Sequence, residues 1–260
     1  MAETCYEISV IQAMFIRTWR KNFSKPGLIL FALIQPIFWI TFFGFLFERY
    51  PLNEATGNVR YIDYLAPGVL VMTILFGASQ SGISYIRDIQ NGFLERLLLT
   101  PASCGSLMAG KILADVIRVL LNGVLVASIA YIVGAHIQMS CAVVVYCIFS
   151  LFLFAWGYSC LSSWLALRTR SQELMAGFIQ ALNMPLIFTS NILVPSRQMP
   201  TWLAYWAQIN PLSAISTSAR ETLNQGFVSR TNLDILLPMM VISALLFMLA
   251  TYELYRYRSR

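Results

Sequence analysis

The sequence contains few charged residues. Asp, Glu, Lys and Arg make up 12% of its 260 residues, whereas apolar residues make up 58%. A soluble domain usually carries about twice this share of charge. Because uncharged runs of about 20 residues can cross hydrocarbon as helices, we predict an all-α membrane protein. The net charge of +6 does not indicate a nucleic-acid partner, since the Lys and Arg residues lie between apolar runs and do not form a basic patch.

Residues for catalysis or metal binding are also scarce. His136 is the single histidine, and no Gly-x-Ser-x-Gly or His-Glu-x-x-His segment accompanies it. The five cysteines form no zinc-like pair, and His136 with Met139 and Cys141 would be a poor set of metal ligands. We therefore expect no catalytic residue and no metal in this chain.

One segment comes close to a nucleotide-binding motif. Gly105 to Lys111 fits Gly-x4-Gly-Lys, but Ile112 follows where a phosphate loop needs Ser or Thr to bind magnesium. A membrane loop also cannot supply the strand that precedes such a loop. We expect no cofactor in this chain, with ATP and Mg²⁺ bound by a partner subunit.

Uncharged runs predict six transmembrane helices within a domain of residues 27–252. The predicted spans are about 27–47, 65–86, 112–135, 140–167, 174–196 and 235–252. In the third span Asp115 and Arg118 lie three residues apart near its start, which predicts an interfacial ion pair.

The predicted loops differ in positive charge. With a cytoplasmic amino terminus, thirteen of the 18 basic residues face inside, so both termini are expected in the cytoplasm of a multi-pass cell (inner or plasma) membrane protein. The expected inside residues are Arg17, Arg20, Lys21, Lys25, Arg87, Arg96, Lys111, Arg118, Arg168, Arg170, Arg256, Arg258 and Arg260; the outside ones are Arg49, Arg60, Arg197, Arg220 and Arg230.

The two chain ends are predicted to lie outside the hydrocarbon. Residues 1–26 are expected to form an interfacial helix, because Ile11, Phe15, Trp19 and Phe23 recur every four positions. This helix could anchor the chain or take part in gating. Residues 253–260 are expected to form a cytoplasmic tail.

The loop between the second and third spans contains an amphipathic segment, residues 92–101. Its apolar residues fall at helical spacing, and Thr100-Pro101 should end the helix. The apolar face could bind a partner protein, or it could be buried in the interface or against neighbouring spans.

The segment before the last span, residues 195–234, predicts an outer helical or re-entrant hairpin. Aromatic residues at helical spacing favour an outer gate, or equally an aromatic-belt anchor. The gate candidates are Pro200, Trp202, Tyr205, Trp206, Asn210 and Pro211.

Uncharged polar residues within the predicted spans are candidates for lining a translocation path. They are Gln35, Gln80, Asn183 and Asn191. Hydrogen bonding between packed helices is the favoured alternative. Pro36 and Pro185 are candidate hinges.

Two segments resemble ABC-2 type permeases, the membrane subunits of ATP-binding-cassette exporters, and most closely the drug-resistance and nodulation-factor exporter permeases. The first is residues 92–101 followed by Gly110-Lys111; the second contains Pro195, residues 199–203, residues 209–212 and Arg220. One difference is Cys104, near which the family often carries a basic residue.

The resemblance implies that two permease subunits, identical or closely related, pair within membrane lipid and bind two cytoplasmic ABC ATPase subunits. Phe93, Leu94 and Leu97 would then enter a groove of the ATPase, while Glu95 and Arg96 fix the register. The implied coupling residues are Gly92, Phe93, Leu94, Glu95, Arg96, Leu97, Thr100 and Pro101.

The expected function is therefore ATP-driven export of an amphiphilic or lipid-like substrate, such as a drug, lipid or glycolipid, by a non-enzymatic transport subunit. The alternatives are a membrane-embedded enzyme or scaffold that acts alone, a polysaccharide-exporting permease, and a proton-driven carrier. A carrier should place an ionisable residue near the middle of the membrane, and none is evident in the sequence.

Overall fold

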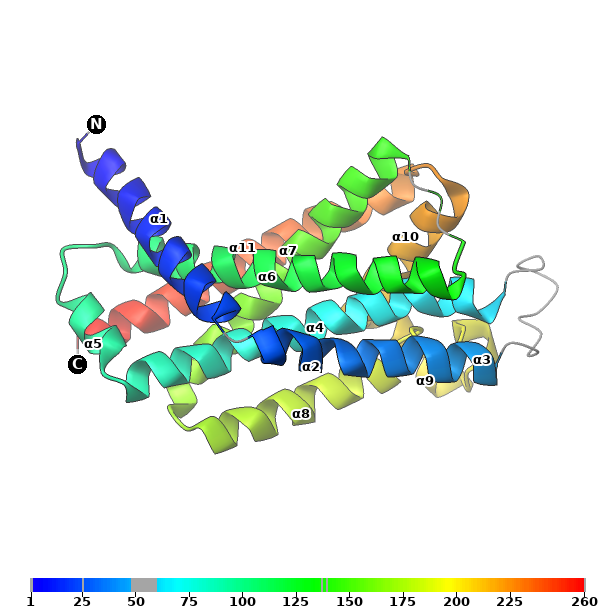
Figure 1. Ribbon diagram of the computed structural model, residues 1–260, viewed down its shortest axis with the longest axis horizontal. Coiled ribbons are helices and arrows are strands. Elements are labelled where there is room, and N and C mark those ends of the chain that lie inside the picture. Colours follow the sequence, from blue (N-terminus) through cyan, green and yellow to red (C-terminus); the bar gives the residue numbers. More distant parts are fainter. Residues whose placement is uncertain (1, 25, 48–59, 137, 139, 260) are drawn as a thin grey trace.

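The computed structural model describes residues 2–24, 26–47, 60–136, 138 and 140–259. Within these ranges every regular element is a helix, which confirms the predicted all-α class. Long helices run roughly side by side in an elongated bundle (Figure 1). Lys25, Arg49 and Arg260, which entered the charge count, and Met139, considered as a metal ligand, lie outside the described residues.

Among the described residues, four helices are long and apolar enough to cross a membrane. They are α4 (Tyr61–Gln90), α6 (Cys104–Val133), α7 (Cys141–Thr169) and α11 (Arg230–Arg258). Each begins before or ends after its predicted span, and α4, α7 and α11 continue through charged residues at one end or both. α6 begins eight residues before its predicted span, so Gly105 to Lys111 is helical and not a phosphate-binding loop.

The other two predicted spans contain shorter helices. α2 (Pro26–Phe38) continues through a π-helical turn (Trp39–Phe43) into α3 (Gly44–Leu46). Pro36 lies within α2, just before the π turn. α8 (Gln172–Phe188) ends well before residue 196, and turns and bends follow it. Whether these two segments cross the membrane stays a prediction.

The amino-terminal helix α1 (Ala2–Phe23) packs on α6. A Cβ atom at Gly110 would lie 2.6 Å from the Ile11 carbonyl oxygen and 2.9 Å from the Met14 Cβ. Real Cβ atoms do not approach so closely, so the glycine permits the close crossing of the two helices.

The centre of the bundle is the contact of α4 with α7. A Cβ atom at Gly82 would lie 2.5 Å from the Ser162 carbonyl oxygen, and the Gly82 amide donates to the Ser162 hydroxyl at 3.1 Å. The main core therefore depends on a small residue where two long helices meet, as is common in membrane proteins.

Two ends of the bundle carry the remaining short helices (Figure 1). One end, here called the α5 end, holds α5 (Phe93–Leu98), the amino terminus and the end of α11. α11 stays helical to Arg258, and the Arg258 guanidinium donates to the carbonyl oxygens of Thr100 and Ala102, at 3.1 Å each. The other end, here called the α10 end, holds a 3₁₀ turn (Ser196–Gln198), α9 (Thr201–Ile209) and α10 (Pro211–Gln225).

Candidate functional site

The α5 segment is a short helix with defined ends. Gly92 precedes it with φ of +63°, in the left-handed region that glycine adopts without strain. At the other end the Thr100 hydroxyl donates to the Leu97 carbonyl oxygen at 2.6 Å, and Pro101 follows. α5 is therefore held as a separate turn between α4 and α6.

The side chains of α5 divide into a buried and an exposed set. Leu94 and Leu98 are 3% and 7% exposed and belong to the main core. Phe93 and Leu97 are half-buried, whereas Glu95 and Arg96 are exposed. The expectation that Leu94 binds a partner is corrected, because Leu94 fills the space beneath α5. The exposed apolar residue is Leu99, at 87%.

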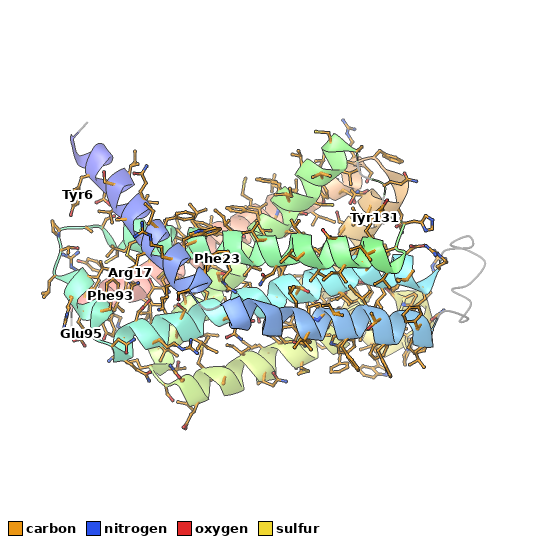
Figure 2. The ribbon with its side chains drawn as sticks, viewed as in Figure 1. Tyr6, Arg17, Phe23, Phe93, Glu95 and Tyr131 are labelled. Carbon is orange, nitrogen blue, oxygen red and sulfur yellow. The ribbon has the colours of Figure 1, made fainter. Side chains whose placement is uncertain are left out.

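Arg17 of α1 covers the side of α5. Its guanidinium carbon lies 3.3 Å from the centroid of the Phe93 ring, and its Nη2 donates to Asp88 Oδ1 at 3.1 Å. Figure 2 shows Arg17 beside Phe93, with Glu95 pointing away from the bundle. Arg17 therefore joins α1 to α4 and α5.

Asp88 is the centre of a charged cluster formed by Arg17, Lys21, Ser84, Asp88 and Lys111. Lys21 Nζ lies 2.8 Å from Oδ1, and Lys111 Nζ lies 3.3 Å from Oδ2. Lys111 also donates to the Ser84 hydroxyl at 2.9 Å. Asp88 and Lys111 are 3% and 1% exposed, so each depends on the other for compensation of its charge.

Sequence reasoning did not find this Asp88 cluster. Lys111 was considered for a nucleotide motif and counted as an inside charge, and Asp88 was given no partner. One pattern in the sequence could have indicated it. Asp88 follows the second predicted span and Lys111 precedes the third, so these opposite charges lie at the same depth relative to the membrane. Burial lowers the pKa of Lys21, because a charged amine is disfavoured away from water, and its hydrogen bond to Asp88 opposes this shift.

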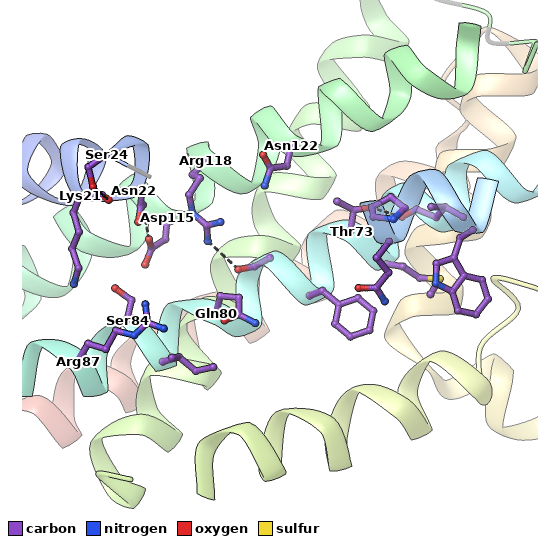
Figure 3. Close-up of a pocket in the computed structure, with 18 of the residues that line it drawn as sticks. Lys21, Asn22, Ser24, Thr73, Gln80, Ser84, Arg87, Asp115, Arg118 and Asn122 are labelled. Atoms are coloured by element: carbon purple, nitrogen blue, oxygen red, sulfur yellow. Dashed lines mark hydrogen bonds between the residues drawn. The ribbon is translucent and has the colours of Figure 1, made fainter. Parts of the chain in front are cut away.

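A cavity of about 640 Å³ lies beside the Asp88 cluster, between the end of α1 and helices α2, α4 and α6. Two of the path candidates, Gln35 and Gln80, line it. Figure 3 shows Lys21, Ser84 and Arg87 at one end, Thr73 at the other, and Gln80 and Arg118 between them. Its polar and charged lining residues include Lys21, Asn22, Ser24, Gln35, Thr73, Gln80, Ser84, Arg87, Asn91, Asp115, Arg118 and Asn122.

Asp115 and Arg118 both line this cavity, but the predicted ion pair between them is wrong. The Asp115 carboxylate accepts hydrogen bonds from the Ser81 hydroxyl at 2.7 Å and the Asn22 amide at 3.0 Å. The Arg118 guanidinium donates to the Gly77 carbonyl oxygen at 3.2 Å. Spacing along α6 permitted a pair, but Asp115 accepts from residues of α1 and α4 and Arg118 donates to a residue of α4, so the two side chains do not bond to each other.

The other two path candidates, Asn183 and Asn191, do not line the cavity. Asn183 is fully buried, where its amide nitrogen donates to the Ser79 hydroxyl at 3.0 Å and its oxygen accepts from the Tyr158 hydroxyl. It joins α8 to α4 and α7. Here the alternative interpretation, a hydrogen bond between packed helices, describes the geometry.

Asn191 lies at the α10 end within a cluster formed by Tyr64, Asn191, Ser213, Ser216, Thr217 and Arg220. Its amide nitrogen donates to Thr217 at 2.7 Å, and its side-chain oxygen accepts from Ser216 at 2.7 Å. This Asn191 cluster ties the segment after α8 to α10.

Arg220 completes the Asn191 cluster. Its guanidinium carbon lies 3.6 Å from the centroid of the Tyr64 ring, and it donates to the carbonyl oxygens of Tyr64 at 3.0 Å and Asn191 at 3.4 Å. Burial lowers the pKa of Arg220. Arg220 was named above as an outside basic residue and as part of the family resemblance, and its contacts were not foreseen.

The outer-gate candidates fall into two groups. Trp202, Tyr205 and Trp206 are 65%, 62% and 56% exposed along one side of α9, which begins directly after Pro200. Asn210 is buried at the junction of α9 and α10.

The Asn210 amide donates to the Leu186 carbonyl oxygen at 2.7 Å, and its oxygen accepts from the Leu212 amide at 2.9 Å. Pro211 is the first residue of α10. Asn210 and Pro211 thus start a helix, and the aromatic side chains of α9 are the exposed part of this segment.

A metal site finds no support in the part of the chain that the structure describes, where no three His, Cys, Asp or Glu side chains gather as ligands. His136 lies beside Arg60, and its Nδ1 is 3.8 Å from Asp63.

Comparison with known proteins gives a family match over residues 9–224, to the ABC-2 type transporter model. The chain is 30% identical over 206 residues to the transport permease ycf38 of Porphyra purpurea, covering 79% of this chain and 69% of that protein. It is 24% identical over 221 residues to the daunorubicin resistance ABC transporter permease DrrB1 of Streptomyces coeruleorubidus, covering 83% and 76%. With the multidrug ABC transporter permease YbhR of Escherichia coli K12 it shares 26% identity over 200 residues, covering 74% and 52%.

Proposed function

Because the chain belongs to the ABC-2 type transporter family, we propose that it is the permease subunit of an exporter that moves an amphiphilic or lipid-like substrate out of the cytoplasm or inner leaflet. The α5 end faces the cytoplasm, and the protein lies in the cell membrane. The relatives named as ABC transporter permeases support the assignment as a permease subunit.

The observation that carries the proposal is the position of Arg17 between the exposed helix and the cavity. Arg17 contacts Phe93 of α5 and Asp88 of α4. One turn further along α1, Lys21, Asn22 and Ser24 line the cavity. A force on α5 would therefore shift the end of α1 and change the shape of the cavity.

The energy for this motion comes from partner subunits. Two ABC ATPase subunits bind ATP and Mg²⁺ and dock on α5, and a second permease subunit, identical or closely related, completes the transporter. The contact surface of α5 consists of Glu95, Arg96 and Leu99, the side chains that the bundle leaves exposed. Phe93 and Leu97 lie at its edge.

Charge reversal on α5 tests the proposal. In Glu95→Arg the side chain is exposed, so the protein should fold normally, while the altered charge should misalign the ATPase. We expect transport to fall about tenfold or more while ATP hydrolysis continues, the factor corresponding to about 1.4 kcal/mol of lost coupling. The measurement is ATP-dependent substrate accumulation in vesicles, together with phosphate release.

Asp234→Arg is the matched control, because Asp234 is also an exposed acid but lies at the α10 end of α11. It should transport like the unmodified protein. Normal transport by Glu95→Arg would remove the proposed role of α5. A permease that transports or cleaves substrate with no ATPase present would overturn the exporter itself.

A further inference from the structure

The cavity beside α6 has an excess of positive charge. Among the described residues, the charged ones that line it are Lys21, Arg87 and Arg118 against one carboxylate, Asp115. Asp88, which pairs with Lys21, is already shared with Arg17 and Lys111. The neighbouring Asp88 cluster therefore adds to the excess and does not cancel it.

Arg118 is the least compensated of these cations. It lies halfway along α6, about 20 Å from the start of the helix at 1.5 Å per residue. Its hydrogen bond is to a neutral carbonyl oxygen, that of Gly77, and its buried Nε has no hydrogen-bond partner. Among the described residues no carboxylate lies within ion-pair distance of it, and an uncompensated cation in a low-polarity surrounding is costly.

Asp115 cannot serve as a counter-ion for a positively charged ligand without losing contacts. One of its oxygens accepts from Asn22 and the other from Ser81. Arg118, one turn along the same helix, would also repel a ligand cation. The cavity therefore favours an anion over a cation.

The lining changes from charged to apolar along the cavity. Lys21, Ser84 and Arg87 gather toward the α5 end. Farther along α4, Val69 and Phe76 line the cavity, together with Trp39 of the π-helical turn that follows α2. A guanidinium forms paired hydrogen bonds with phosphate or carboxylate oxygens, while the aromatic and aliphatic wall suits hydrocarbon.

We propose that this cavity binds an amphiphile with an anionic headgroup, that Arg118 pairs with the anion, and that the wall of α2 and α4 receives its apolar part. The inference rests on the proposed function, of which it names the substrate class. Lys21 and Arg87 form the charged mouth at which the headgroup arrives.

Binding to the full chain, purified in a neutral detergent with no ATPase present, tests the inference. The probe is a fluorescent phosphatidic acid, and the comparison probes are phosphatidylcholine and an alkyl trimethylammonium with the same label and chain length. Fluorescence anisotropy should show phosphatidic acid bound about tenfold tighter than either, which is about 1.4 kcal/mol. Equal binding of phosphatidylcholine, or tighter binding of the cation, would overturn the inference.

Arg118→Gln should reduce binding of phosphatidic acid about tenfold, with Arg118→Lys intermediate. Arg168→Gln is the control, because Arg168 is exposed on α7 and pairs with Glu253 outside the cavity. Unchanged binding in a folded Arg118→Gln protein would also overturn the inference. If that variant does not fold, Arg118→Lys and the comparison of probes on the unmodified protein still decide it.

Inorganic phosphate alone distinguishes an anion site from an amphiphile site. It should compete only at far higher concentration than phosphatidic acid, and equal affinity would exclude a role for the apolar wall. If the protein binds phosphatidic acid selectively but shows no ATP-driven transport, the proposed exporter function is rejected and the proposed binding site is retained. ATP-driven transport restricted to neutral or cationic substrates would keep the exporter and reject this inference.

Discussion

The Asp88 cluster and the Asn191 cluster hold opposite ends of the bundle by different interactions. In the Asp88 cluster one buried carboxylate joins three cations that come from α1 and α6. In the Asn191 cluster hydroxyls, amides and backbone carbonyl oxygens join α4, α10 and the segment after α8, and the single cation, Arg220, bonds to neutral groups.

This difference bears on how the bundle can move. A buried carboxylate shared among several cations allows one cation to leave while the others still compensate the charge. Neutral hydrogen bonds with fixed geometry lose their partners when helices slide, and each buried unpaired group is costly. We therefore regard the α5 end as the part that rearranges and the α10 end as the anchor.

The largest effect is expected from Asp88→Asn. The substitution leaves Lys111, which is 1% exposed, without a counter-ion in the core. Removing one partner of a buried ion pair costs about 3–5 kcal/mol of the free energy of unfolding. Unfolding in mixed micelles by increasing denaturing detergent measures the loss, and a cost below about 1 kcal/mol would mean that Lys111 is compensated elsewhere.

A double variant sharpens this test. Asp88→Asn with Lys111→Met should recover most of the loss, because the remaining cations can turn toward solvent. The side chains of Arg17 and Lys21 are 32% and 34% exposed. If the double variant is no more stable than Asp88→Asn alone, Lys111 is not the cause of the instability.

At the α10 end, Arg220→Gln should cost less. It removes the contact of the guanidinium with the Tyr64 ring and the hydrogen bonds to two carbonyl oxygens. For a partly buried cation these interactions together contribute about 2 kcal/mol to the free energy of unfolding. The same unfolding measurement applies. Arg197→Gln, an exposed arginine in the 3₁₀ turn, is the control and should have no effect. Equal stability of both variants would remove the anchoring role of Arg220.

How well the sequence predicts the contacts at the two ends of the bundle depends on how far apart the contacting residues lie along the chain. The apolar runs predict long helices because each run is by itself long enough to span the hydrocarbon. The match over residues 9–224 confirmed the family resemblance of residues 92–101. The Asp88 cluster was missed because Arg17 and Lys21 are 71 and 67 residues away from Asp88.

The incorrect pairing of Asp115 with Arg118 has a related cause. The local rule for residues three apart considers a single helix, whereas Ser81 and Asn22 reach Asp115 from two others. Gly110 and Lys111 were noticed for a nucleotide motif, but they serve helix packing and charge compensation. Such roles depend on which helices are neighbours, and hydrophobic periodicity does not specify this.

A smaller effect is expected where α1 meets α5. Arg17→Gln and Phe93→Leu each remove the stacked contact of 3.3 Å, so a double-mutant cycle isolates it. We expect a coupling energy of about 1 kcal/mol, because the arginine is partly exposed. A coupling near zero would mean that α1 and α5 move independently, and Arg17 would then not transmit motion to the cavity.

The smallest effect, and the one that depends on pH, is expected at Glu7. Its carboxylate accepts from the Ser103 hydroxyl at 2.7 Å and the Ser103 amide at 3.3 Å, where Ser103 caps α6. Hydrogen bonds from Ser106 and Ser103 hold the pKa of Glu7 below its usual 4.5. The charged form is therefore favoured in the folded state, so its stabilising contribution is complete above pH 4.5 and is lost as the pH falls through the lower folded-state pKa.

Glu7→Gln removes this titration. The unmodified protein should be slightly more stable than the variant at pH 7, and the two unfolding curves should converge under acidic conditions. Gln12→Ala, at an exposed position of the same helix, would report any general effect of altering α1. A difference between Glu7→Gln and the unmodified protein that persists unchanged into strong acid would show that Glu7 acts by packing and not by its charge, and α1 would then be tied to α6 mainly through the Gly110 crossing.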